Sequence, residues 1–152
     1  MKILARHLTV DLYNCKTAIL SDGELVQAQF KSILHDRRCE VLNMVSQQIA
    51  PDHLALMFIF TEGHVGIHVY SSMRYVAVDI FLCTPEAEPE MLARDIRNFF
   101  KPDKIKTTLL KRGDFEQDTE IKPKTKTRVA PLRKIHNTGA KVIRILARRN
   151  KK

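Results

Sequence analysis

Hydrophobic and polar residues alternate in the first part of the chain and then recur at helical spacing. Residues 7–13 place apolar side chains on one side and polar side chains on the other, which is typical of a half-buried strand. Residues 21–24 have the spacing of a capping box. The apolar residues that follow predict a helix that buries one face; they are Val26, Phe30, Ile33 and Leu34.

The middle of the chain has the patterns of four strands. Residues 39–45 predict one strand. Residues 54–60 are continuously apolar, which favours a central strand buried on both faces. Residues 65–70 and 75–83 predict a hairpin, with residues 71–74 as its connection.

A second helix is predicted to begin at Pro89 and to end before Pro102, because proline suits the first turn of a helix but not its interior. Residues 104–110 predict a further strand. The order is therefore β-α-β-β-β-β-α-β, which indicates an α+β sandwich: a mainly antiparallel sheet covered on one face by two helices. The other face also needs burial, so we expect a homodimer in which the sheets of two copies pack together.

Charge divides the chain into two parts. The whole chain has 26 Lys+Arg and 17 Asp+Glu, but residues 122–152 contain 12 of the basic residues and no acidic ones. The part before residue 122 therefore holds 14 basic and 17 acidic residues and is mildly acidic. We predict a domain over residues 1–112 and a basic tail over residues 113–152. Within this tail, residues 113–131 indicate a linker or an extended arm, and residues 140–149 predict a short helix.

The cysteines and the lengths of the apolar runs exclude several classes of protein. Cys15, Cys39 and Cys83 are odd in number and widely spaced, which favours a reducing cytoplasm over a disulfide framework. The chain has no pattern of a signal peptide and no apolar run long enough to cross a bilayer. We therefore expect a cytoplasmic protein with no membrane partner.

Side chains that could act in catalysis or ligand binding are concentrated between residues 62 and 83. His64 and His68 share one face of a predicted strand, but no third metal ligand accompanies them, so we expect a hydrogen-bonded pocket pair and no metal site. Asp79 lies in an apolar strand and needs a hydrogen-bond partner if it is buried. Asp11 falls on the polar side of the first strand, where water can solvate it.

Two segments of the chain resemble a known family. They are TEGHVGIH at residues 61–68 and YVAVDIFLC at residues 75–83, with RHLTVDLY at residues 6–13 in support. These segments resemble the bacterial and archaeal S-adenosylmethionine decarboxylases, in which Glu-Ser-His precedes a second His and an Ala-Val-Asp-x-Phe-x-Cys strand follows. The resemblance extends over about residues 6–110.

The resemblance implies a pyruvoyl-dependent lyase of polyamine (spermidine) synthesis. In the family, a serine attacks the carbonyl of the preceding glutamate, here Glu62, and elimination then cuts the chain and leaves a pyruvoyl group. The pyruvoyl carbonyl forms a Schiff base with the substrate and acts as an electron sink during decarboxylation. The resemblance implies that His68 handles the proton lost during processing and that Cys83 is the proton donor during decarboxylation.

Gly63 occupies the position of that serine. Glycine has neither a hydroxyl to attack the Glu62 carbonyl nor a Cβ–O bond to break. We therefore expect an intact chain that forms no pyruvoyl group and holds no other cofactor. Ser71 and Ser72 cannot replace the missing group, because the acyl shift needs its nucleophile directly after the scissile carbonyl.

The substrate-binding positions implied by the family have changed as well. Ser46, Gln47 and Ile49 stand where the family places aromatic residues, and Tyr70-Ser71-Ser72 stands where Trp-Pro-Glu is usual. A missing stacking partner and a missing charged acceptor each cost about 1–3 kcal/mol. S-adenosylmethionine is therefore expected to bind weakly or not at all. The candidate ligand-binding residues are His64, Tyr70, Ser71, Ser72 and Ile49.

The leading hypothesis is a non-catalytic homologue of S-adenosylmethionine decarboxylase. Such a protein would bind S-adenosylmethionine or a polyamine as a sensor, or pair with an active paralogue and regulate it. One alternative is an enzyme with pyruvoyl-independent acid–base chemistry on S-adenosylmethionine or an amine, using Glu62, His64, His68 and Cys83. Another alternative is that Gly63 was introduced by engineering into the precursor of a working enzyme. The changed pocket residues argue against this alternative.

The basic tail leaves two further interpretations open. The simplest is a solvated extension. The alternative is that the tail binds nucleic acid with the domain as a dimeric platform, because lysine and arginine neutralise phosphates whatever the base sequence. The tail has no aromatic residue for base stacking beyond His136, so this binding would be nonspecific.

Overall fold

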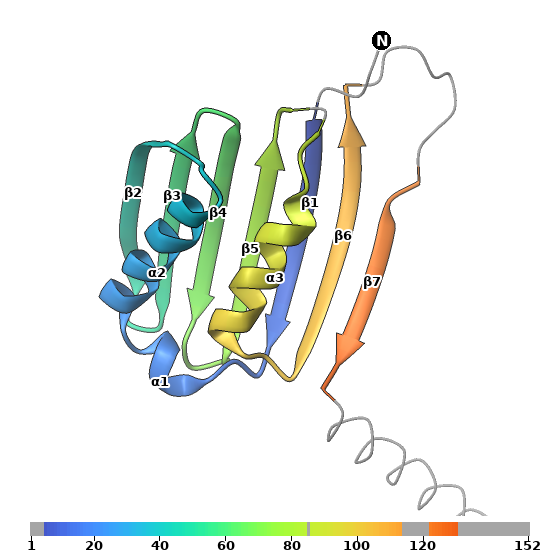
Figure 1. The fold of residues 1–152 in the computed structure, drawn as a ribbon. Helices are drawn as coiled ribbons and strands as arrows, with labels where there is room; N and C mark the ends of the chain where they lie inside the picture. The colour runs from blue at the N-terminus through green and yellow to red at the C-terminus, as the bar shows by residue number, and fades with distance from the viewer. Residues whose placement is uncertain (1–4, 85, 114–121, 131–152) are drawn as a thin grey trace, which may run out of the picture.

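The computed structural model describes residues 5–84, 86–113 and 122–130. Seven strands form one sheet in the order β2-β3-β4-β5-β1-β6-β7, and every neighbouring pair is antiparallel (Figure 1). The elements are β1 (Ala5–Tyr13), α1 (Thr17–Leu20), α2 (Gly23–Asp36), β2 (Val41–Ala50), β3 (His53–Phe60), β4 (Gly63–Tyr70), β5 (Tyr75–Leu82), α3 (Pro89–Phe100), β6 (Lys104–Arg112) and β7 (Lys124–Val129).

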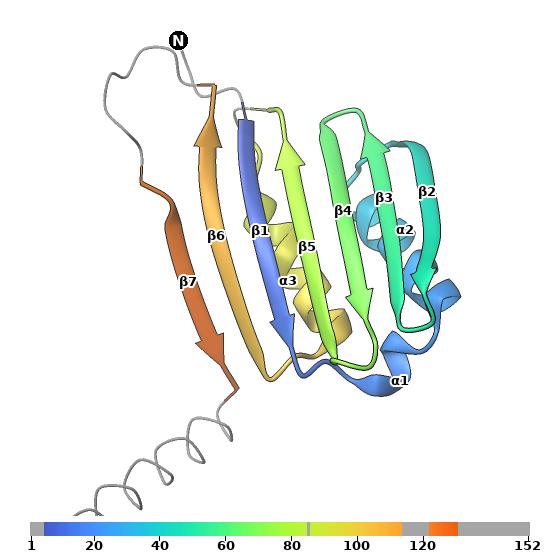
Figure 2. The same ribbon diagram turned by 180° about the vertical axis from the view of Figure 1, so that it is seen from behind.

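The two longer helices, α2 and α3, cover one face of the sheet (Figure 1), and none of the helices in the described residues lies on the opposite face (Figure 2). This confirms the predicted α+β fold with two helices on one face. Alternate residues of the strands enter the core beneath the helices, among them Leu8, Val10 and Leu12 of β1. The helices bury Phe30 and Phe100 against them, so the core lies entirely between the helices and the covered face of the sheet.

Local signals in the sequence explain where the helices begin and end. The Asp22 carboxylate accepts a hydrogen bond from the Leu25 backbone N–H at 2.9 Å and so caps the start of α2. Pro89 opens α3. The helix ends at Lys101, which adopts a left-handed conformation with φ 47° before Pro102.

The prediction of a central strand over residues 54–60, buried on both faces, is wrong for this chain. β3 lies next to the β2 edge of the sheet, and only one of its sides enters the core. On the other side, Met57 is 39% exposed and Ile59 is 44% exposed. The continuous apolar run therefore reflects hydrophobic side chains on the open face as well as in the core.

Two elements have no counterpart in the predicted order. The short helix α1 precedes α2, and β7 forms within residues 113–131, which were predicted as a linker or extended arm. β7 pairs with β6, and the Thr108 and Thr125 hydroxyls lie 3.0 Å apart across the pair. β2 also extends through Gln48 to Ala50, beyond the predicted residues 39–45. The helix predicted over residues 140–149 lies outside the described residues.

No helix within residues 5–84, 86–113 and 122–130 has the length and hydropathy needed to cross a membrane.

Candidate functional site

β4 positions most of the residues that the sequence singled out. Glu62 ends the turn between β3 and β4, and its carbonyl accepts a hydrogen bond from the Cys83 backbone N–H at 2.7 Å. Gly63 begins β4 and pairs with Leu82 of β5. The Glu62–Gly63 peptide bond, Cys83 and the end of β5 therefore lie together at one end of the sheet.

Gly63 has a backbone conformation that only glycine tolerates. Its φ is 154°, and a Cβ atom built on it would lie 1.9 Å from the carbonyl oxygen of Phe81 on the neighbouring strand. A serine side chain cannot be placed there unless the backbone of one of the two strands moves. The sequence showed that the hydroxyl was missing, and the structure adds that the space for it is missing as well.

The Glu62 side chain is close to the loop that follows α2. Its Oε2 atom is buried and has no hydrogen-bond partner among the described residues. The pKa of the nearby Cys39 thiol is raised, first by burial and second by the negative charge of Glu62. The Cys39 sulfur lies 3.8 Å from the Arg37 carbonyl oxygen.

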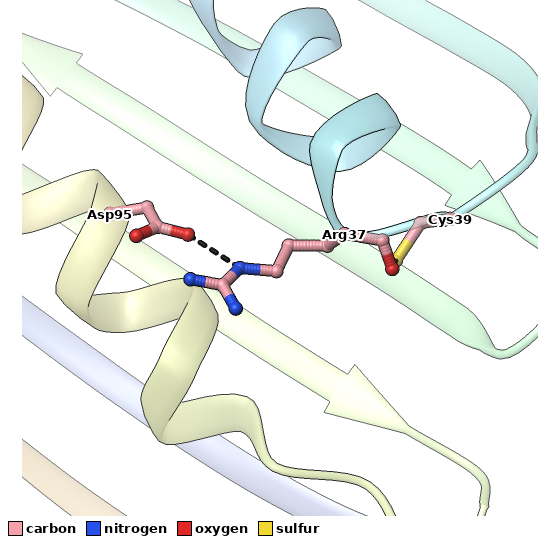
Figure 3. Close-up of polar contacts among 3 residues, drawn as sticks. All are labelled: Arg37, Cys39 and Asp95. Atoms are coloured by element: carbon pink, nitrogen blue, oxygen red, sulfur yellow. Dashed lines mark hydrogen bonds and ion pairs between the residues drawn. The ribbon is translucent and has the colours of Figure 1, made fainter.

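Arg37 in turn joins the two covering helices. Its guanidinium Nε donates a hydrogen bond to Asp95 of α3 at 2.6 Å (Figure 3). This hydrogen bond is the main reason that the pKa of the Arg37 guanidinium is raised. Arg37 therefore holds the loop that carries Cys39 close to α3.

On the open face near Gly63, His64 and Phe81 form a stacked pair with ring centroids 5.3 Å apart. Phe81 also contacts His7 edge-on at 6.0 Å, and the Arg112 guanidinium lies over the Phe81 ring at 5.4 Å. The His7 Nε2 atom lies 3.2 Å from Asp79 Oδ1, and the Asp79 side chain is 51% exposed, so Asp79 is not buried in its apolar strand. Within the described part of the chain, no group of three or more metal-ligating side chains is present.

His68 lies farther along β4, on the same face as His64. It lies five positions after Gly63, which corresponds to roughly 16 Å along a strand. Its Nδ1 atom lies 2.9 Å from Nε2 of His53 on β3. In the single chain, His68 is therefore held by a neighbouring histidine and not by the Glu62–Gly63 peptide.

Tyr70 belongs to a row of rings that crosses four strands at the far end of β4. Its ring stacks on His53 at 4.2 Å and on Tyr75 at 5.9 Å, and Tyr75 lies 5.3 Å from Tyr13. The Tyr75 hydroxyl donates a hydrogen bond to Asp11 at 2.5 Å. Burial, followed by this carboxylate, raises the pKa of Tyr75 well above its ordinary value.

Ser71 and Ser72 join two turns at the same end of the sheet. The Ser71 backbone N–H donates to the Asp52 carbonyl at 2.9 Å, and the Ser72 hydroxyl bonds to the Asp52 carboxylate. Ile49 is exposed beside Ala50, whose strand partner is His53. Tyr70, Ser71, Ser72 and Ile49 therefore share one end of the sheet, whereas Glu62, Gly63, His64 and Cys83 share the other.

Sequence reasoning missed several residues of both groups. His53 and Asp52 at one end, and His7 and Phe81 at the other, were not singled out. The alternation in residues 7–13 did place His7, Asp11 and Tyr13 on one polar side of a strand. The alternation does not give the order of the strands in the sheet. That order places β1 beside β5 and so brings Tyr13 against Tyr75.

Comparisons with known proteins show which family the chain is similar to. The family model described as S-adenosylmethionine decarboxylase matches residues 6–113. The S-adenosylmethionine decarboxylase proenzyme of Methanococcus vannielii is 29% identical over 119 residues, covering 77% of this chain and 98% of that protein. The proenzyme of Caldicellulosiruptor saccharolyticus is 28% identical over 121 residues, covering 80% and 98%.

The fold is also similar to that of a solved structure. The crystal structure of the adenosylmethionine decarboxylase from Aquifex aeolicus VF5 superposes with a TM-score of 0.70 at 17% identity. The superposition covers 80% of this chain and 100% of that one. β7 lies beyond residue 113, where the family match ends.

Proposed function

The chain belongs to the S-adenosylmethionine decarboxylase family, and from this premise we propose that it is a homologue that does not process itself to a pyruvoyl enzyme. In this proposal it binds a small molecule of the polyamine pathway and acts as a sensor or as a regulatory partner. The observation that carries the proposal is Gly63. Its missing hydroxyl removes the nucleophile of self-cleavage, and a Cβ built on Gly63 would lie 1.9 Å from the Phe81 carbonyl oxygen, which leaves no room for a serine side chain.

The other family-equivalent residues are spread along β4 within the single chain. Acid–base chemistry by Glu62, His64, His68 and Cys83 would need these groups around one reacting atom. β4 separates His68 from Glu62, Gly63 and Cys83 within the single chain, and His68 contacts His53 instead. The alternative of a pyruvoyl-independent enzyme therefore gains no support from the geometry.

The row of rings at Tyr70 is the best place for a ligand. Tyr70 and Tyr75 offer an aromatic surface of the kind that attracts a sulfonium or ammonium group, and the Tyr13 ring beside them already has the Lys104 ammonium over it at 4.9 Å. The carboxylates of Asp11 and Asp52 lie at this end of the sheet and add negative charge. We therefore propose that a cationic ligand, such as S-adenosylmethionine or a polyamine, binds here, with Ser71, Ser72 and Ile49 at the margin.

The open face of the sheet is the proposed contact with a second protein chain. Val45, Met57 and Ile59 expose apolar side chains on it, and no helix covers them. A second copy of the sheet would bury these residues, giving a homodimer. An active paralogue would offer a similar face, which would give a heteromer.

Intact-mass measurement of the purified full chain tests the central claim. We expect one uncleaved species of 17.5 kDa and no carbon dioxide from S-adenosylmethionine. Two fragments separated between Glu62 and Gly63, with a blocked amino terminus on the second, would overturn the proposal.

Calorimetric titration of the same protein with S-adenosylmethionine, its decarboxylated form and spermidine tests the ligand claim. We expect binding of at least one of these, weakened by Tyr70→Ala. Ser21→Ala, at an exposed position beside α2, serves as the control and should leave binding unchanged. The ligand proposal would be contradicted if none of the three ligands gave a heat of binding. It would also be contradicted if the Tyr70→Ala variant bound as tightly as the wild type.

A further inference from the structure

A groove of about 280 Å³ is lined by residues of α3, β1, β6 and β7. α3 lies on the face of the sheet that the helices cover (Figure 1). The floor of the groove includes Leu8, Ile105 and Thr107 of the neighbouring strands. Its walls carry charged side chains, which are Glu90, Arg94 and Arg97 of α3 and Lys126 and Arg128 of β7.

The strand register explains why the cations of β7 enter this groove. Lys124, Lys126 and Arg128 pair with Leu109, Thr107 and Ile105 of β6, and directly paired residues point to the same side of a sheet. Ile105 is buried beneath the helices, so the three cations point toward the helix side as well. They follow one another at roughly 6.6 Å, two residues along a strand.

This arrangement concentrates like charge. Four cationic side chains line the groove against the one carboxylate of Glu90. No carboxylate among the described residues forms an ion pair with Arg94 or Lys126. Lysines often protect the edge of a sheet from pairing with other chains, but that role does not need arginines from a helix on the same groove. Such a concentration of cations repels itself unless an anion is present.

We propose that this groove binds the phosphate backbone of a nucleic acid. A row of cations along a strand matches a polyanion better than it matches one small anion. The groove has no aromatic lining, so it offers no stacking of bases and no sequence preference. The sequence that follows β7 contains 8 further Lys and Arg residues.

An anionic membrane is the weaker candidate for this surface. The exposed large apolar side chains of the described residues lie on α2, β2, β3 and the turn after β4, and none of them lines the groove. Membrane-surface binding needs such apolar anchors beside the cations. The groove also depends on β7, which lies outside the family match, and it does not depend on Gly63.

Fluorescence anisotropy on the full chain tests the proposal, with a labelled single strand of mixed sequence, its RNA equivalent and its duplex as probes. For four phosphate contacts, the affinity should fall roughly 50- to 150-fold between about 50 and 200 mM salt. The variant with Arg94→Gln, Lys126→Gln and Arg128→Gln should bind at least tenfold more weakly at low salt. Its salt slope should be smaller by roughly 2–3.

Two matched variants remove the same number of charges elsewhere. Lys16→Gln, Lys31→Gln and Arg38→Gln change exposed cations near α1 and α2 and should leave binding as in the wild type. Lys141→Gln, Arg144→Gln and Arg148→Gln should weaken binding less than the groove variant. If the triple change disturbs folding, Lys126→Gln alone replaces it as the test, because this residue lies on an exposed edge strand. The single change should reduce the salt slope by roughly one.

Several results would overturn the proposal. The first is that the wild type binds no nucleic acid at low salt. The second is that the groove variants bind as tightly as the wild type. The third is that only the variant of residues 141–148 loses binding. Binding to vesicles of phosphatidylserine and phosphatidylcholine with none to nucleic acid would assign the groove to a membrane instead.

Discussion

Gly63 affects both the chemistry that this chain can perform and the stability of its fold. Its φ of 154° and the 1.9 Å separation between a built Cβ and the Phe81 oxygen mean that any side chain strains the start of β4. We predict that Gly63→Ser does not restore self-cleavage and lowers the free energy of unfolding by at least about 1–3 kcal/mol. Urea unfolding and intact mass measure the two effects.

Gly66 provides the control for that substitution. A Cβ there would meet the end of the Met57 side chain at 3.4 Å, an ordinary contact. Gly66→Ala should therefore be neutral or stabilise the fold by up to about 1 kcal/mol, because alanine restricts the unfolded chain. A Gly63→Ser protein that is as stable as Gly66→Ala, or that cleaves itself, would contradict the steric argument.

Cys15 makes the stability of the fold sensitive to alkali. It is fully buried, and burial raises the pKa of its thiol from 9.0 to about 12. Below pH 9 the thiol is neutral in both the folded and the unfolded chain, so its contribution is fully present. Above pH 9 only the unfolded chain releases the proton, so stability should fall up to about pH 12, with a slope approaching about 1.4 kcal/mol per pH unit.

Urea unfolding at several pH values between 8 and 12 measures this slope. Cys15→Ala should be less stable at every pH, because it leaves a small cavity, but its stability should decline less steeply. Cys83→Ala removes an exposed cysteine and should keep the slope of the wild type. Parallel declines in all three proteins would show that Cys15 is not responsible.

Among the elements, α2 and α3 are held together by one half-buried ion pair. Arg37 and Asp95 lie 2.6 Å apart, with side chains 34% and 27% exposed. A double-mutant cycle with Arg37→Gln and Asp95→Asn should give a coupling energy of about 0.5–1 kcal/mol. The exposed pair of His35 and Asp36, at 3.7 Å, should give none that can be measured. Equal coupling in the two pairs would contradict this interpretation.

The helices and strands also show how much of the fold can be predicted from a single sequence. Periodicity predicted β1, α2 and α3 because each buries one apolar side. It missed β7, because alternating lysine and threonine carry no hydrophobic signal, and the strand depends on its pairing with β6. The grouping of His68 with Glu62 came from the family resemblance and not from periodicity, and it stays a prediction.

For the molecule as a whole, the open face of the sheet determines the expected assembly. Met57→Asp with Ile59→Asp would place two charges in the contact between copies, at a cost of roughly 2 kcal/mol or more each. The proposed dimer should therefore dissociate to monomers, which light scattering after size exclusion detects. Leu25→Asp changes an apolar residue that is 41% exposed on α2 and should leave the dimer intact. A monomeric wild type would refute the proposed interface.

The crowding of Gly63 against Phe81 also bears on the history of this chain. Replacing the glycine codon by a serine codon would return the lost oxygen atom, yet the returned side chain would collide with the neighbouring strand. A serine at this position would therefore need a simultaneous shift of the backbone. On the proposal that the chain does not process itself, one mutation can introduce the glycine, but its reversal alone does not provide room for the serine.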